Sequence, residues 1–199
     1  MGTHLFLSPH LDDAILSCGG VIHHLAQDGE RVIIVTAMAG EPPDALPDSP
    51  VLHAIRTQWA NANNTFRARR AEDAQAAHSL KAQVYHMALL ESAFRQTLCG
   101  AGSPIALYPE HDSVFAINEA DDARLTLFET RLPFEEVITI YAPFGVDNHV
   151  DHQLVRDWAL VLTGPAHAPA LKFYEEYPHA RSKASVQRAQ AFYQHSRPP

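Results

Sequence analysis

Residues 5–37 read LFLSPHLDDAILSCGGVIHHLAQDGERVIIVTA, and the fold class can be predicted from their pattern. Leu5–Leu7 is a short apolar run that stops at Pro9, because proline has no N–H to donate to a sheet. An apolar pattern of helical period follows and ends near Gly29, and Arg31–Ala37 then reads as a buried, β-branched strand. A strand, a helix and a second strand in this order predict a βαβ unit with a right-handed crossover and a parallel sheet.

The rest of the chain continues the alternation of strands and helices. Further strands are expected at 83–86, 136–141 and 171–174, and helices at 52–80 (two), at 121–130 and from about 149 onward. Residues 40–50 hold four prolines and three acids and read as a loop beside the ligand site, and 91–112 are expected to be irregular. No repeat or linker divides the chain, so we expect one α/β domain over residues 1–199 with a mainly parallel sheet.

Composition narrows the class of protein. Of the 199 residues, 46% are hydrophobic and 19% charged, as in ordinary globular domains. The net charge of −8 argues against a nucleic-acid-binding surface. Two cysteines make no disulfide framework, and we find neither a signal peptide nor an apolar run of the roughly 20 residues that span a bilayer. We therefore expect a cytoplasmic protein without a membrane or nucleic-acid partner; a homo-oligomer is left open.

Two short segments hold the unusual polar residues of the chain. The first is SPHLDD at 8–13 and the second is DNHVDH at 147–152. Each follows a predicted strand and opens a predicted helix. In a parallel sheet both segments therefore lie at the carboxyl edge, where open α/β folds bind ligands. Segments that are far apart in the sequence are thus expected to meet in space.

The residue types in these segments are those of a metal hydrolase. Zinc hydrolases use three histidine or carboxylate ligands, and His10 with Asp13 can supply two from one turn. A histidine from 147–152 would complete the set, and Asp12 is the adjacent carboxylate that could act as general base. A single histidine or aspartate at a helix start is more often a cap. The pairing of the two segments is what favours a metal site.

The two segments resemble the PIG-L/LmbE-like family of zinc-dependent N-deacetylases. The resemblance rests on PHLDD at 9–13, on Cys-Gly-Gly at 18–20 and on HVDH at 149–152, and as a fold it covers roughly residues 3–176. It implies a Rossmann-like three-layer fold. It also implies hydrolysis of an acetamide on an amino sugar or related glycoside.

The resemblance implies roles for individual residues. His10, Asp13 and His152 would bind one Zn²⁺ per chain, a set that also suits Fe²⁺. Asp12 would be the general base, and His149 would stabilise the oxyanion or protonate the leaving amine. By the same resemblance, Asp151 would orient a histidine.

The resemblance also points to further residues, but it leaves more than one role open for them. Arg69 lies in a segment like the family's Arg-x-x-Glu and would bind a substrate hydroxyl or phosphate, unless it forms a surface ion pair. Glu91 and Arg95 stand where relatives often contact substrate, and the segment at 174–178 reads as core packing. Some relatives have a tyrosine where this chain has Asp147, which leaves the leaving-group acid open.

The sequence therefore predicts zinc-dependent hydrolysis of the N-acetyl group of an amino-sugar-like or glycoside-like small molecule. Another single-metal hydrolase, acting on an ester or a peptide amide, and a non-catalytic small-molecule-binding module of the same fold stay open. A dinucleotide-binding site is disfavoured, because the Cys-Gly-Gly at 18–20 lacks the glycine spacing of that site and lies inside the helix.

Overall fold

The centre of the fold is a five-stranded parallel sheet. The computed structural model describes residues 2–60, 66–100, 102–116, 118, 122–164 and 169–196. The strand order is β3-β2-β1-β6-β7, and every neighbouring pair runs parallel. The strands are β1 (Thr3–Ser8), β2 (Arg31–Thr36), β3 (Gln83–His86), β6 (Val137–Pro143) and β7 (Ala170–Tyr174). The predicted α/β fold with a mainly parallel sheet is confirmed.

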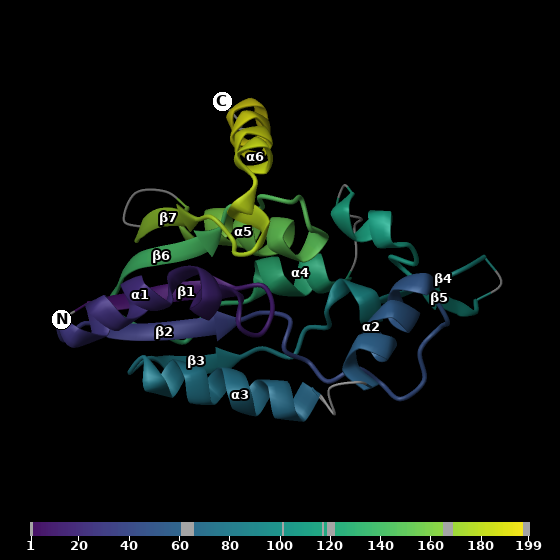
Figure 1. The fold of residues 1–199 in the computed structure, drawn as a ribbon, viewed down its shortest axis with the longest axis horizontal. Helices are drawn as coiled ribbons and strands as arrows, with labels where there is room; N and C mark the ends of the chain where they lie inside the picture. The colour runs from purple at the N-terminus through teal and green to yellow at the C-terminus, as the bar shows by residue number, and fades with distance from the viewer. Residues whose placement is uncertain are drawn as a thin grey trace.

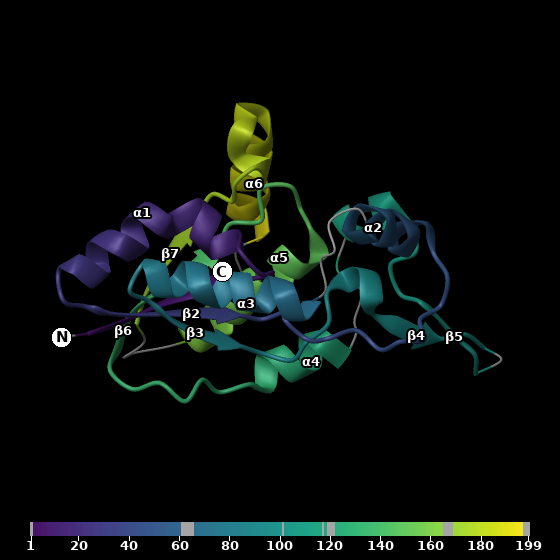
Figure 2. The same ribbon diagram turned by 60° about the horizontal axis from the view of Figure 1, so that its bottom comes forward.

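Helices cover both faces of this sheet, as Figures 1 and 2 show. The helices that pack on it are α1 (Asp13–Gln27), α3 (Phe66–Ser79), α4 (Asp122–Glu129) and α5 (Val150–Leu162). Phe6 and Ile34 pack with α1 and α3, whereas Leu5 and Ile33 pack with α4 and α5. Successive strand residues point to opposite faces, so each strand contributes to two apolar layers. The result is the three-layer arrangement that the sequence predicts.

The carboxyl edge of the sheet carries a further lobe. It contains α2 (Pro50–Ala60), the single turns η1 (Ser92–Phe94) and η2 (His111–Phe115), and a hairpin of β4 (Gln96–Leu98) with β5 (Pro104–Ala106). The expectation of an irregular 91–112 is wrong for these parts. These strands have only three residues each, and their side chains are mostly exposed. The sequence there shows no alternation of apolar and polar residues from which a strand could be predicted. The sequence predicts the α2 and α3 pair correctly.

The polar end of the chain, where the sequence predicts no element, forms η3 (His179–Arg181) and α6 (Lys183–Ser196). In Figure 1, α6 stands away from the body of the molecule. Residue 121, with which one predicted helix begins, lies outside the described residues. Within the described ranges, no helix combines the length and apolar character that crossing a membrane requires.

The largest fully buried side chain among the described residues gives a test of the core. Trp158 of α5 is 0% exposed, and its indole N–H has no hydrogen-bond partner among the described residues. We expect Trp158→Ala to lower the free energy of unfolding by about 3–5 kcal/mol, because it leaves a cavity beneath the sheet. Trp158→Phe keeps an aromatic ring and loses no hydrogen bond, so its cost is expected to be well below that of the alanine variant. Urea denaturation measures both; equal losses would contradict this packing.

Candidate metal centre

The pairing of β1 with β6 brings the two polar segments together. These strands are neighbours, with Leu5 opposite Ile140 and Phe6 opposite Tyr141. His10 lies in the loop that leaves β1, and His149 is the residue that caps the start of α5. Their ring centroids are 5.0 Å apart. The predicted convergence of residues 8–13 and 147–152 is thus found at the carboxyl edge of the sheet.

Three side chains from these segments point their donor atoms at one another. A ligand atom from each of His10, Asp13 and His152 lies within 4.8 Å of the other two. Asp13 Oδ2 is 3.2 Å from His10 Nδ1 and 3.4 Å from His152 Nε2. Two imidazole nitrogens and a carboxylate oxygen are the three-ligand set of many catalytic metal sites. These residues could therefore hold a metal ion.

Each of the two histidines is held from behind by a buried carboxylate. His10 Nε2 is 2.8 Å from Asp151 Oδ2, and His152 Nδ1 is 3.1 Å from Glu176 Oε1. Both carboxylates are 0% exposed. Such hydrogen bonds select the tautomer and the orientation of a ligand histidine. They leave His10 Nδ1 and His152 Nε2 to face Asp13, so the expectation that Asp151 orients a histidine agrees with this geometry.

Asp151 is in turn fixed by the turn η1. The backbone N–H of Ser92 donates to Asp151 Oδ2 over 2.9 Å, and the Arg95 guanidinium donates to Oδ1. Arg95 is only 6% exposed, and its charge holds the pKa of the Asp151 carboxyl far below the usual range even though burial opposes this. Arg95 therefore contacts Asp151 at the back of the site. The buried carboxylate stays ionised because it is paired.

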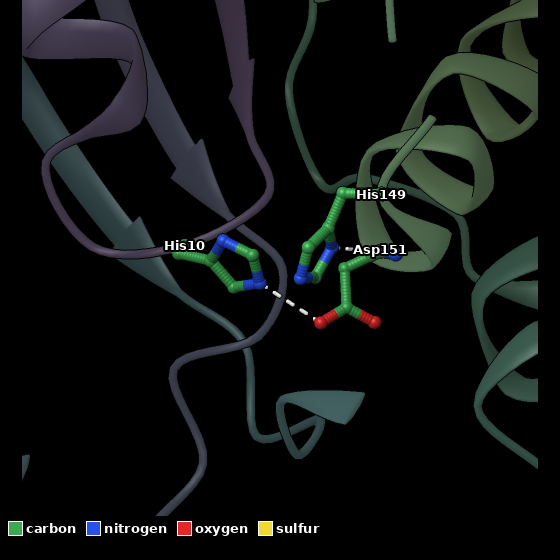
Figure 3. A group of neighbouring side chains, drawn as sticks. All are labelled: His10, His149 and Asp151. Atoms are coloured by element: carbon green, nitrogen blue, oxygen red, sulfur yellow. Dashed lines mark hydrogen bonds and ion pairs between the residues drawn. The ribbon is translucent and has the colours of Figure 1, made fainter. Parts of the chain in front are cut away.

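A second group of potential ligands comprises His10, His149 and Asp151. Figure 3 shows the three side chains, with His10 Nε2 directed at the Asp151 carboxylate. An ion here would have to break that hydrogen bond and compete with the donors on Asp151. In the set of His10, Asp13 and His152, an ion would replace only the protons that Asp13 shares with the two histidines, and the hydrogen bonds from Asp151 and Glu176 would stay in place. It is therefore the better candidate for a metal ion.

The charges around the better set also suit a divalent cation. Asp13, Asp151 and Glu176 contact its histidines, and the Arg95 guanidinium contacts one of these carboxylates, Asp151. With neutral histidines, three carboxylates against one guanidinium leave two negative charges. Buried charge of this size needs a counter-ion or protons. A divalent ion would supply the balance.

When no metal is bound, protons on the two histidines balance the negative charge of the buried carboxylates. Burial alone would lower the pKa of His152, but Asp13 and Glu176 outweigh it and raise the pKa to about 9. The pKa of His10 is raised for the same reason, through Asp13 and Asp151. Burial would raise the pKa of Asp13, but His152 and His10 hold it well below its usual value. A metal ion that binds these residues displaces protons from them.

His149 has a different environment from the other two histidines. Its Nδ1 accepts a hydrogen bond from the backbone N–H of Asp151 over 3.2 Å, which caps α5. Burial lowers the pKa of His149 to about 3, and the nearby Asp151 charge does not reverse this. The imidazole is therefore neutral, with its proton on Nε2. This state favours the expected role as a hydrogen-bond donor to an oxyanion over protonation of the leaving amine.

Asp12 does not belong to either group of potential ligands found among the described residues. Its side chain is half-buried, and burial together with the charge of Asp73 raises its pKa, against the opposing charge of Arg69. A raised pKa brings a carboxylate closer to the range that suits a general base. Asp12 and Asp13 are neighbours in the sequence, but their carboxyl groups thus lie in different environments.

Arg69 is paired with Glu91 near the site. Its Nη1 is 3.3 Å from Glu91 Oε1, and the two side chains are 19% and 13% exposed. This is a largely buried ion pair rather than the surface pair that the sequence left open. Burial raises the pKa of Glu91, whereas the charges of His10 and Arg69 oppose this rise.

The structure also reveals site residues that sequence reasoning missed. Glu176 was expected in core packing, but it binds His152 and accepts a hydrogen bond from the backbone N–H of Gly145. His179 has no predicted partner, yet its Nδ1 lies 2.6 Å from Asp147 Oδ2 and its ring centroid lies 5.7 Å from that of His152. The tandem acids directly after the last strand were the available signal for Glu176.

A cavity of about 380 Å³ opens beside His10 and His149. Its apolar wall comes mainly from α2 and η2, and its acids are Glu91 and Glu110. The residues that line it are His10, Pro50, Val51, Ala54, Ile55, Glu91, Ser92, Ala93, Glu110, His111, Val114, Phe115 and His149. One candidate metal ligand, His10, thus lines a cavity large enough for a small molecule.

Comparison with known proteins agrees with this site. The profile of the PIG-L family, described as GlcNAc-PI de-N-acetylase, matches residues 5–162. The chain is 28% identical over 181 residues to a 1D-myo-inositol 2-acetamido-2-deoxy-alpha-D-glucopyranoside deacetylase of Saccharopolyspora erythraea, covering 87% of this chain and 57% of the relative. It is 27% identical over 191 residues to the 2'-N-acetylparomamine deacetylase of Streptomyces fradiae, covering 93% and 60%. The chain therefore spans about three fifths of the length of these relatives.

Solved structures give the same result for the fold. A deacetylase–teicoplanin complex from teicoplanin biosynthesis matches 92% of this chain and 73% of its own, with a TM-score of 0.69 and 27% identity. A zinc-inhibited form of teicoplanin deacetylase matches 92% and 71%, with a TM-score of 0.64 and 28% identity. Both similarities extend over nearly the whole of the present chain.

The carboxylate behind His152 can be tested without touching a ligand. We expect Glu176→Ala to weaken metal binding by about 10- to 100-fold, because His152 loses the partner that orients its ring. Competition with a chromophoric chelator measures the affinity. Glu175→Ala is the matched control, since Glu175 is the neighbouring acid and is exposed. Equal affinities in the two variants would show that the hydrogen bond to His152 has no part in metal binding.

Proposed function

The chain belongs to the PIG-L family, and from this membership we propose that it is a metal-dependent deacetylase that hydrolyses the N-acetyl group of an amino sugar or related glycoside. The observation that carries the proposal is the set of His10, Asp13 and His152, with a buried carboxylate behind each histidine and a cavity beside it. The similar proteins named as deacetylases of acetylated amino sugars support the substrate class.

His10 Nδ1, Asp13 and His152 Nε2 are the proposed ligands of one divalent ion per chain. When bound, such an ion polarises the acetamide carbonyl and lowers the pKa of a water molecule. Zinc suits this donor set, and so does Fe²⁺. Because one similar deacetylase has a zinc-inhibited form, the metal that supports activity is best identified by loading the metal-free protein with each ion separately.

In the proposed reaction, one residue of this chain transfers protons and another stabilises the developing negative charge. Asp12 takes a proton from the attacking water, whose oxygen forms the new bond to the acetyl carbon. The neutral imidazole of His149 donates its Nε2 proton in a hydrogen bond to the carbonyl oxygen as negative charge develops there. The C–N bond then breaks, and Asp12 returns the proton to the leaving nitrogen. The products are the free amine and acetic acid, which ionises to acetate in water.

The cavity indicates which amino sugars the site prefers. Among the described residues, its lining includes Glu91 and Glu110 but neither arginine nor lysine, and Ile55 and Phe115 belong to its apolar wall. A neutral or cationic sugar with an apolar substituent matches this lining, whereas a phosphorylated sugar would be repelled. Arg69 does not line the cavity, so we place it behind Glu91, where its guanidinium orients that carboxylate toward substrate.

The base can be separated from the ligands by one substitution. We expect Asp12→Asn to retain one metal ion per chain and to lower kcat by about 10²- to 10⁴-fold. Asparagine tolerates the left-handed backbone of this position, so the loop should keep its shape. Acetate release and elemental analysis give the two readouts. Near wild-type kcat with metal bound would show that Asp12 is not the base, and loss of metal would place it among the ligands.

The substrate preference is tested with two N-acetylglucosamine derivatives. We expect kcat/KM to be at least about 10-fold higher for an octyl glycoside than for the 6-phosphate, because the cavity is apolar and acidic. Glu110→Gln should reduce the difference in kcat/KM between the two substrates, because the loss of this carboxylate weakens the repulsion of the phosphate group. A preference for the phosphorylated sugar would contradict our interpretation of the cavity. Failure of both substrates would instead count against the proposed substrate class.

A further inference from the structure

Asp12 and Asp13 are adjacent residues with different tasks in the proposed reaction. Asp13 Oδ2 faces both candidate ligand histidines, whereas Asp12 belongs to neither ligand group in the described part of the chain. Neighbouring side chains can serve two tasks only if the backbone between them directs each one separately. The backbone of Asp12 is unusual in this respect, since its φ is 77° and its ψ is −19°. Non-glycine residues rarely adopt this left-handed conformation.

Hydrogen bonds on both sides of Asp12 hold this conformation. The carbonyl oxygen of Asp12 accepts a bond from Leu16 N over 2.8 Å in the first turn of α1. Its amide N–H donates to Asp73 Oδ1 over 3.0 Å, across 61 residues of sequence. With both flanking peptide groups held, φ and ψ are set, and the direction of the Cα–Cβ bond is set with them.

Asp73 is built into the interior rather than placed on the surface. It lies on α3 and is 1% exposed. Its second oxygen, Oδ2, is 2.7 Å from Nε2 of His86, a side chain that is 10% exposed. His86 is the last residue of β3 and lies opposite Thr36, at the same carboxyl edge as the metal centre. The pair thus links α3 and β3 to the loop that carries both aspartates.

We propose that the buried Asp73–His86 pair is a positioning device that holds Asp12 in its left-handed conformation and so directs the Asp12 carboxylate toward substrate. This inference rests on the proposed function, in which Asp12 is the general base. His86 fixes the Asp73 carboxylate, and Asp73 fixes the Asp12 amide. Asp73 and His86 are therefore positioning residues that act through Asp12.

The contact of Asp73 with a backbone amide distinguishes this role from support of the metal centre. No hydrogen bond or ion pair of Asp73 or His86 in the described residues reaches His10, Asp13 or His152. Loss of the pair should therefore change turnover while metal content stays constant. Since the reacting carboxylate would be displaced rather than removed, we expect a fall in kcat of about 10- to 100-fold with KM nearly unchanged.

The test compares Asp73→Ala with Asp73→Asn. The alanine variant removes the acceptor for the Asp12 amide and should show the loss in kcat. The asparagine variant keeps an Oδ1 acceptor and can donate to His86, so it should recover most of the activity when each protein is compared at its own pH optimum. The pH is adjusted in this way because both variants also remove the charge of Asp73, which acts on the Asp12 carboxyl. His86→Phe keeps the volume and leaves Asp73 without this partner, and an intermediate kcat is expected. Asp28→Ala is the matched control, since Asp28 pairs with His24 at the exposed far end of α1.

A second readout does not depend on the substrate. Hydrogen exchange followed by NMR should show the Asp12 amide protected in the wild type and exchanging at least about 10-fold faster in Asp73→Ala. Unchanged exchange, or unchanged kcat at equal metal content, would overturn the positioning role. Parallel loss of metal and kcat would do the same, because the pair would then serve the metal centre. Absence of acetate release by the wild type would instead count against the proposed function. Hydrogen exchange of the Asp12 amide would then still show whether its hydrogen bond to Asp73 forms.

Discussion

The parallel pairing of β1 with β6 is the contact on which the candidate site depends. It places the loop of residues 8–13 beside the start of α5, although more than a hundred residues separate them in the sequence. Both strands are covered on each face by helices, so their register is held by buried side chains. A shift of this register would move His152 relative to Asp13. The geometry of the metal centre is therefore a consequence of how the central strands pack.

Burial of several carboxylates is the second constraint. Asp73, Asp151 and Glu176 are each almost fully inaccessible to solvent, and each is hydrogen-bonded to a histidine. An isolated buried carboxylate would be strongly destabilising, whereas one paired with imidazole and backbone N–H donors is tolerated. The same pairs limit how the histidine rings can turn. Stability of the interior and order in the site thus come from the same hydrogen bonds.

The site extends beyond the segment that matches the family profile. The match ends at residue 162, yet Glu176 contacts His152 and His179 contacts Asp147 from the segment after β7. The curated relatives are longer than this chain, and the similar structures also contain residues outside the matched region. The segment after the last strand therefore completes the environment of one proposed ligand, even though it lies outside the matched family segment.

The central strands, most of the helices and the two segments that carry the proposed ligands could be predicted from the order of the amino acids alone. These features are local: β-branched runs indicate strands, and polar residues at strand-to-helix junctions indicate the carboxyl edge of a parallel sheet. Folding of the chain brings Asp151 behind His10, Glu176 behind His152 and Asp73 to the amide of Asp12, and none of these contacts could be predicted beforehand. An acid that will be buried and paired has the same local sequence as one that stays in solvent. The histidine or amide with which such an acid pairs lies 24 to 141 positions away in the sequence, so a local sequence pattern does not identify it.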